Sequence, residues 1–208
     1  MRAFSMGAVF AGAILLGAIL GLVACGEAAV VEADLPADVL SGDHLWVVDE
    51  AASTLRFRGR QEGAAFEGEF ERWSAQINLD PDDLSDAQIR ASIDMGSAVT
   101  GDGDRDGALP TRDWFDAKAF PVATFTSDRV MRDAGGLVAD GTLSIKGVEP
   151  AVVLPFTLDV DGERAVADGR LNLSRADYGV GSGSYATEEW IAFPVDVILH
   201  VEAYRRTP

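Results

Sequence analysis

The chain has 208 residues, an apolar content of 48% and a formal charge of −17 at pH 7. So acidic a surface repels nucleic acid and anionic lipid headgroups, which excludes a nucleic-acid-binding role and a polybasic membrane contact. The single cysteine excludes an intramolecular disulfide, so packing must supply the stability of the fold.

The first 24 residues have the layout of a secretory signal. Arg2 provides a positive start, residues 8–20 are apolar or glycine, and small residues precede Cys25. The sequence Leu22-Val23-Ala24-Cys25 resembles a bacterial lipobox, which implies a lipoprotein signal peptide over residues 1–24 and acyl chains on Cys25. An uncleaved anchor remains an alternative, because about 20 apolar residues can span a bilayer. An ordinary signal followed by an incidental cysteine is another.

This N-terminus predicts a lipid-anchored protein that faces the periplasm of a bacterial cell envelope. Gly26, rather than Asp, follows the cysteine, and by resemblance to enterobacterial sorting rules this favours the outer membrane over the inner membrane. Residues 25–44 are rich in Ala, Glu and Asp, which predicts a flexible acidic linker between the membrane and the folded domain.

Residues 45–204 alternate between apolar and polar side chains in runs that turn signals separate. The alternation is clear in residues 89–95, 137–145, 152–160, 165–173 and 191–201. This pattern is typical of antiparallel strands with one buried face. About eight such strands predict an all-β antiparallel barrel, whose interior is either packed or holds one small ligand.

Two local features interrupt the alternation. Phe70 and Trp73 stand on opposite parities, which predicts a bulge or bend near Glu71-Arg72. The only helix is expected within residues 111–119. The glycine-rich stretch 179–184 predicts a loop at the barrel mouth.

The sequence carries no recognisable catalytic or metal-binding motif. His44 and His200 stand far apart, and the Cys-x-x-Cys, His-Glu-x-x-His and Gly-x-Ser-x-Gly patterns are missing, so we expect neither an enzyme nor a cofactor. Asp102, Asp104 and Asp106 match the opening of a calcium loop. The preceding strand pattern favours an acidic turn instead, because a calcium hand needs helices on both sides.

The ordered motifs together resemble the YceI family of exported lipocalin-like proteins over residues 46–203. They are Trp46-Val47-Val48-Asp49, Ser53-Thr54-Leu55-Arg56-Phe57, Glu67-Gly68-Glu69-Phe70, Arg105-Asp106, Leu109-Pro110, Trp114-Phe115-Asp116, Phe120-Pro121, Ala123-Thr124-Phe125, Leu143-Ser144-Ile145-Lys146-Gly147-Val148 and Leu173-Ser174-Arg175-Ala176-Asp177-Tyr178-Gly179-Val180. Ala52 and Leu109-Pro110-Thr111 depart from the commoner pattern. They resemble a branch associated with b-type membrane cytochromes, which suggests such a cytochrome as a partner.

The resemblance implies an eight-stranded antiparallel lipocalin-like barrel that holds a long isoprenoid chain, polyprenyl or quinone-like, as a carrier, reservoir or scavenger. The apolar parity of the strands suits a hydrocarbon tail. The same side chains could instead fill the interior. Small residues on the inward parity favour a hollow interior: Ala91, Ala139, Gly141, Ala167 and Gly169.

We expect a ligand cavity whose wall includes Phe57, Phe70, Ile93, Phe125, Leu143, Phe156, Leu171 and Phe193. Arg175 is the candidate contact for a polar headgroup. The alternative for Arg175 is an ion pair with Asp177 or with the acidic turn at Asp104 and Asp106. The second functional hypothesis is an acidic lipoprotein that docks on an envelope or electron-transport partner without a lipid ligand.

Overall fold

The computed structural model describes residues 40–206. The predicted signal at 1–24, Cys25 and most of the linker at 25–44 lie outside these residues. Within the described range, no helix combines the length and apolar character that crossing a membrane requires.

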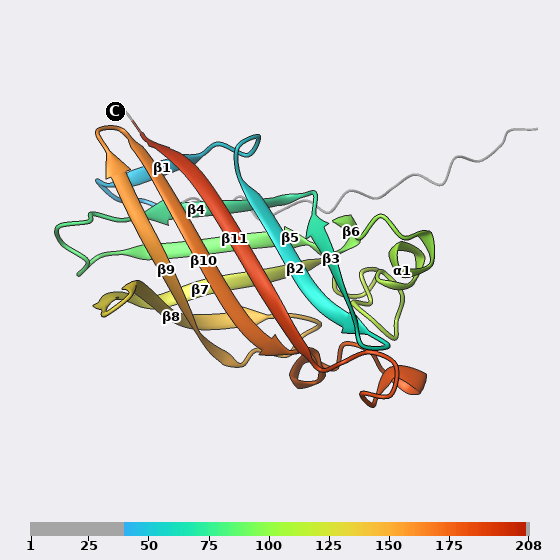
Figure 1. Ribbon diagram of the computed structural model, residues 1–208. Coiled ribbons are helices and arrows are strands. Elements are labelled where there is room, and N and C mark those ends of the chain that lie inside the picture. The colour runs from blue at the N-terminus through green and yellow to red at the C-terminus, as the bar shows by residue number, and fades with distance from the viewer. Residues whose placement is uncertain (1–39, 207–208) are drawn as a thin grey trace, which may run out of the picture. The chain divides into compact units, whose positions relative to one another are not determined.

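Among residues 40–206, eleven strands form one antiparallel sheet, and one short α-helix, α1 (Gly103–Ala108), lies beside it (Figure 1). The strands are β1 (Leu45–Val48), β2 (Thr54–Gln61), β3 (Ala64–Phe70), β4 (Trp73–Asn78), β5 (Gln88–Asp94), β6 (Ala98–Val99), β7 (Val122–Asp133), β8 (Gly136–Ser144), β9 (Ala151–Asp161), β10 (Arg164–Ser174) and β11 (Pro194–Arg205).

The sheet closes into a barrel because its last strand returns to its first. The order β1-β4-β5-β7-β8-β9-β10-β11 is completed by pairing of β11 with β1. β1 and β2 both pair with β11 and together form one bent strand of the ring. β3 and β4, which only two residues separate, form a second bent strand. The ring therefore has eight strands, which confirms the predicted antiparallel barrel.

The predicted bend near Glu71-Arg72 is confirmed. β3 ends at Phe70 and β4 begins at Trp73, with the two intervening residues outside both strands. Phe70 and Trp73 nevertheless both line the barrel interior. An interruption of two residues thus restores the inward direction of the apolar side chains after the change of parity.

A buried polar cluster holds this bend. The Arg72 guanidinium contacts the Asp94 carboxylate, with 2.8 Å between Nη2 and Oδ2, and the Asp94 side chain is 4% exposed. The same carboxylate accepts the backbone N–H of Gly96. The Ser97 hydroxyl accepts the backbone N–H of Arg72 and lies 2.7 Å from the carbonyl oxygen of Asp94, to which it donates. The bend is therefore fastened to the end of β5.

The prediction of a helix within residues 111–119 is wrong. This segment folds as consecutive turns, and the helix α1 lies earlier, inside the acidic stretch. The Asp102 side chain starts α1 by accepting two backbone N–H groups of its first turn.

The Asp106 carboxylate accepts the N–H and the hydroxyl of Thr100. Across residues 40–206, no group of three His, Cys, Asp or Glu side chains is placed to hold a metal ion.

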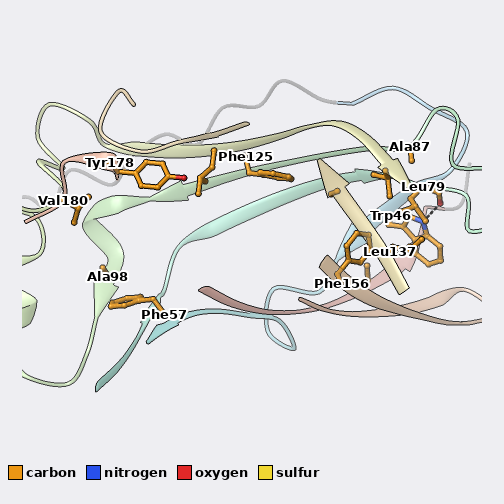
Figure 2. Packing of buried hydrophobic residues seen from close by; sticks show 14 of the residues in the cluster. Trp46, Phe57, Leu79, Ala87, Ala98, Phe125, Leu137, Phe156, Tyr178 and Val180 are labelled. Carbon is orange, nitrogen blue, oxygen red and sulfur yellow. Dashed lines mark hydrogen bonds between the residues drawn. The ribbon is translucent and has the colours of Figure 1, made fainter. Parts of the chain in front are cut away.

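The hydrophobic core extends along the barrel rather than forming one compact cluster. Figure 2 shows Trp46 and Leu79 at one end of the cluster and Tyr178 and Val180 at the other, with Phe125 between them. The indole N–H of Trp46 donates to the carbonyl oxygen of Leu79 at 2.9 Å, so the one polar atom of this ring is satisfied.

Arg175 holds the long connection between β10 and β11. Its side chain is buried, and its guanidinium donates to the backbone carbonyl oxygens of five residues at 2.6–3.3 Å: Val180, Gly181, Thr187, Ile191 and Ala192. A Cβ on Gly181 would lie 2.2 Å from the Arg175 Nη1, so only glycine allows this approach. Burial lowers the pKa of the guanidinium.

Replacing Arg175 with Met should destabilise the protein strongly. The substitution keeps much of the apolar stem but leaves five backbone carbonyl oxygens without their donor, and three of these hydrogen bonds are buried. We expect the loss to cost about 3–5 kcal/mol. Urea unfolding followed by tryptophan fluorescence measures the loss. The exposed Arg112→Met variant is the matched control, and equal unfolding midpoints for the two variants would contradict the assigned role.

The outer face of β10 and β11 carries a histidine between two carboxylates. His200 lies 2.7 Å from Asp168 through Nδ1 and 3.6 Å from Glu202 through Nε2. The hydrogen bond to Asp168 is the main reason that the pKa of His200 is raised above its ordinary value. A raised pKa in the folded state means that the ion pair stabilises the fold below the unfolded pKa. This contribution is lost as the pH rises through the folded pKa.

The His200→Gln substitution should therefore reduce the free energy of unfolding more at about pH 5.5 than at about pH 8.5. Urea unfolding of the variant and of the unmodified protein at both pH values measures the difference. An equal loss at both values would show that the charge of His200 does not contribute.

Candidate functional site

The barrel interior contains a partly open cavity of about 190 Å³ whose wall is entirely apolar. All eight strands of the ring contribute to the wall, together with residues that directly follow β4, β5 and β8. The lining residues are Trp46, Leu55, Phe70, Trp73, Ala75, Ile77, Leu79, Ile89, Ala91, Ile93, Met95, Ala123, Phe125, Leu143, Ile145, Leu154, Phe156, Leu158, Ala165, Ala167, Leu171, Val197, Leu199, Val201 and Ala203.

Six of the nine side chains that sequence patterning assigned to the site lie in this wall. They come from six different strands, β3, β5, β7, β8, β9 and β10, and they are Phe70, Ile93, Phe125, Leu143, Phe156 and Leu171. The period-two alternation therefore identified the inward face of each of these strands.

The two other predicted phenylalanines pack next to the cavity or away from it. Phe57 is buried against Phe66 and Phe70, with ring centroids 6.5 Å and 5.3 Å away, so it supports the wall from β2. Phe193 precedes β11 and lies 5.1 Å from the Arg175 guanidinium. The parity of β11 extrapolates to Phe193, but the strand begins only at the next residue.

Arg175 does not reach the cavity wall. The guanidinium is held by backbone carbonyl oxygens, which leaves it no donor for a headgroup in this conformation. The ion pairs among the described residues do not join Arg175 to Asp177, Asp104 or Asp106 either. Arg175 is thus neither a headgroup contact nor an ion-pair partner, but a buried cation whose donors bind loop carbonyl oxygens. Gly181, which allows the close approach of the guanidinium, was the one sequence signal for this arrangement.

The small inward residues have two different uses. Ala91 and Ala167 line the cavity from opposite sides of the ring, so their size does leave space. Gly141 serves strand pairing instead, because a Cβ there would lie 2.3 Å from the carbonyl oxygen of Thr126, beside the register shift between β7 and β8. Ala139 is completely buried, and a Cβ on Gly169 would contact the Leu199 side chain at 3.0 Å.

The volume and chemistry of the cavity suit a slender apolar group. A dry apolar cavity of about 150 Å³ is known to accept benzene, whereas sites for drug-sized ligands span about 300–1,000 Å³. At about 190 Å³ the cavity lies between these cases. It can take a section of hydrocarbon chain directly, and a longer chain must run along the barrel or move side chains apart.

A second opening, the side cleft, adjoins the cavity through Leu55, Phe70 and Trp73, which line both. The side cleft has a volume of about 490 Å³ and a mixed polar and apolar wall. Its remaining lining residues are Glu50, Ser53, Thr54, Glu69, Glu71, Arg72 and Ser74.

Comparisons with known proteins agree with this architecture. The crystal structure of BcnA from Burkholderia cenocepacia is 31% identical, with a TM-score of 0.72, and covers 75% of this chain and 99% of that chain. A polyisoprenoid binding domain from Saccharophagus degradans is 21% identical, with a TM-score of 0.60, over 78% of this chain and 98% of that chain. A UPF0312 protein of Vibrio campbellii is 26% identical over 187 residues, which is 83% of this chain and 92% of the relative.

The match to a YceI-like domain extends from residue 46 to residue 203, and so takes in the closed ring and all of the cavity wall. The chain belongs to the YceI family.

Proposed function

We propose that this protein binds a long-chain isoprenoid lipid, polyprenyl or quinone-like, in the barrel cavity and serves in the cell envelope as a carrier, reservoir or scavenger. The observation that carries the proposal is the cavity inside the barrel, whose wholly apolar wall receives a contribution from every strand of the ring. Such a wall gives a hydrocarbon chain a favourable environment and offers nothing to a charged or strongly polar ligand.

The expected driving force is the removal of apolar surface from water. Each CH₂ group that enters the cavity contributes about 0.8 kcal/mol, so the affinity grows with the length of the chain that fits. β7 and β11 have 12 residues each and extend about 40 Å at roughly 3.3 Å per residue. A linear chain laid along the strands uses this length better than a compact ring system does.

The comparisons support an isoprenoid among the possible hydrocarbon ligands. The Saccharophagus degradans domain is described as polyisoprenoid binding, and it shares the barrel fold with this chain. At 21% identity it contributes the fold alone, so the apolar wall of this chain remains the main argument. A quinone among the ligands would also fit the b-type cytochrome partner suggested by the family branch.

We assign a binding role rather than a catalytic one. The wall of the cavity presents only hydrocarbon, thioether and indole groups, and the indole N–H of Trp46 is engaged with Leu79. No side chain in that wall can act as a nucleophile or transfer a proton to a bound ligand.

We also propose that Cys25 carries acyl chains that keep the barrel next to a membrane. The support is the lipobox pattern before Cys25 and the acidic linker that follows. Several acyl chains hold a protein firmly, because each buried CH₂ adds about 0.8 kcal/mol. The barrel would then load from the adjacent lipid phase of the envelope.

Filling the cavity should abolish lipid binding without unfolding the barrel. Ala91→Leu combined with Ala167→Leu adds six carbon atoms from opposite walls, and we expect at least a tenfold lower lipid content. The measurement is mass spectrometry of organic extracts from protein purified from native membranes. Gly141 is unsuitable for this purpose because its Cβ would strike backbone.

The matched control adds the same atoms outside the barrel. Ala65→Leu combined with Ala151→Leu places them at exposed positions on β3 and β9, and this variant should keep its lipid. Extracts without isoprenoid lipid from the unmodified protein, together with no binding of added ubiquinone or prenyl alcohols, would refute the proposed function. Such a result would favour the second hypothesis, in which the protein docks on an envelope or electron-transport partner without a lipid ligand.

The Cys25→Ala substitution should release the protein from the membrane fraction and prevent labelling with radioactive palmitate. Fractionation and labelling of intact cells measure both effects. Continued membrane attachment of the variant would favour an uncleaved anchor over acylation.

A further inference from the structure

The barrel wall has a gap beside the cavity. β1 and β4 pair through Leu45 with Asn78 and through Trp46 with Ile77, and β2 and β3 pair from Arg56 with Glu69 onward. Between these two ladders, the described residues 47–55 and 70–76 form no strand pairs with each other. The side cleft lies at this interruption, since its lining residues come from 50–55 and 69–74.

The gap affects only the edge of residues 47–55 that faces β3 and β4. Toward β11, both ends of the same stretch remain paired, because Val47 and Val48 lie opposite Tyr204 and Ala203, and Thr54 lies opposite His200. On the other edge, the contact between Arg72 and the buried Asp94 carboxylate ties the chain between β3 and β4 to the end of β5. The opening is therefore built into the fold by the bend.

The side cleft changes from apolar to acidic over a short distance. Leu55, Phe70 and Trp73 belong to both the cavity and the side cleft. Beyond them, the rim carries three exposed carboxylates: Glu50, Glu69 and Glu71.

The positive groups near the rim do not balance these carboxylates. Arg72 is engaged with the Asp94 carboxylate through both Nε and Nη2. Arg56 lies opposite Glu69 in the β2–β3 ladder, so at most one of the three carboxylates has a basic residue directly across from it. The whole chain is also strongly acidic, at −17, so the surroundings add to the negative potential.

We propose that the side cleft receives the headgroup of a lipid whose tail occupies the cavity, and that its acidic rim selects uncharged headgroups over phosphorylated ones. The inference rests on the proposed function, because it assigns a place and a charge preference to the headgroup of the same ligand. It favours quinones and prenyl alcohols and disfavours prenyl diphosphates. The volume of about 490 Å³ is in the range that holds a small ring or hydroxyl headgroup.

Two probes that share the same prenyl chain distinguish the contribution of the headgroup to the affinity from that of the chain. Geranylgeraniol and geranylgeranyl diphosphate differ only in the headgroup, and competition against a fluorescent prenyl probe gives both affinities. We expect the alcohol to bind the unmodified protein roughly fivefold to tenfold more tightly at low salt, with a smaller ratio at about 0.5 M NaCl.

Charge variants locate the effect. Substituting Glu50, Glu69 and Glu71 with Gln should bring the two affinities within about twofold of each other, chiefly by strengthening diphosphate binding. The matched control replaces three exposed carboxylates on the far side of the ring, Asp133, Asp159 and Asp161, with Asn. This control changes the net charge equally and should keep most of the preference.

Each result decides the inference. Equal binding of the two probes by the unmodified protein, or the same change in both charge variants, would overturn the headgroup assignment while leaving lipid binding intact. Absence of binding for both probes and for ubiquinone would refute the proposed function together with the inference. Stronger diphosphate binding in the variant of Glu50, Glu69 and Glu71, without the same change in the control variant, would support the headgroup assignment.

Discussion

The contact between Arg72 and the buried Asp94 carboxylate is the constraint on which the barrel interior depends. It fixes the two residues that separate β3 from β4, and this interruption lets Phe70 and Trp73 both face inward. A carboxylate at this depth without a cationic partner would cost several kcal/mol, so the buried Asp94 side chain depends on Arg72. One ion pair thus decides both how the wall closes and where it remains open.

The hollow interior follows from the sizes of the residues around the ring. Alanines at positions 75, 91, 123, 165, 167 and 203 lie among larger aliphatic and aromatic groups in the wall. Barrels of eight strands have an interior that side chains can just fill, so a few missing methyl groups decide between a packed core and a cavity. The remaining space is modest because Phe125, Phe156 and two tryptophans project into it.

Much of the barrel could be predicted from the sequence because period two is a local signal. The alternation identified the strands, and the change of parity between Phe70 and Trp73 located the bend. The helix α1 was missed because it buries no residue, so no apolar periodicity marks its position in the sequence.

The site was predictable only in part, since it depends on contacts between distant residues. Parity placed Leu143 and Phe156 in the wall, but it carried no information about the volume left between opposite strands. The environment of Arg175 depends on a loop that folds back on it with its backbone carbonyl oxygens. The side cleft could not be foreseen either, because it results from pairing that stops between two ladders.

If the protein binds a lipid as proposed, the wholly apolar wall has a consequence for how that lipid leaves. Water does not stabilise an apolar cavity of this size, so the departing chain would leave a void rather than a hydrated space. The chain itself would also be exposed to water if it dissociated into free solution. Both costs fall when the barrel is pressed against an acceptor of similar polarity. Exchange should therefore proceed by collision with a bilayer or another protein, and its rate should rise with the acceptor concentration.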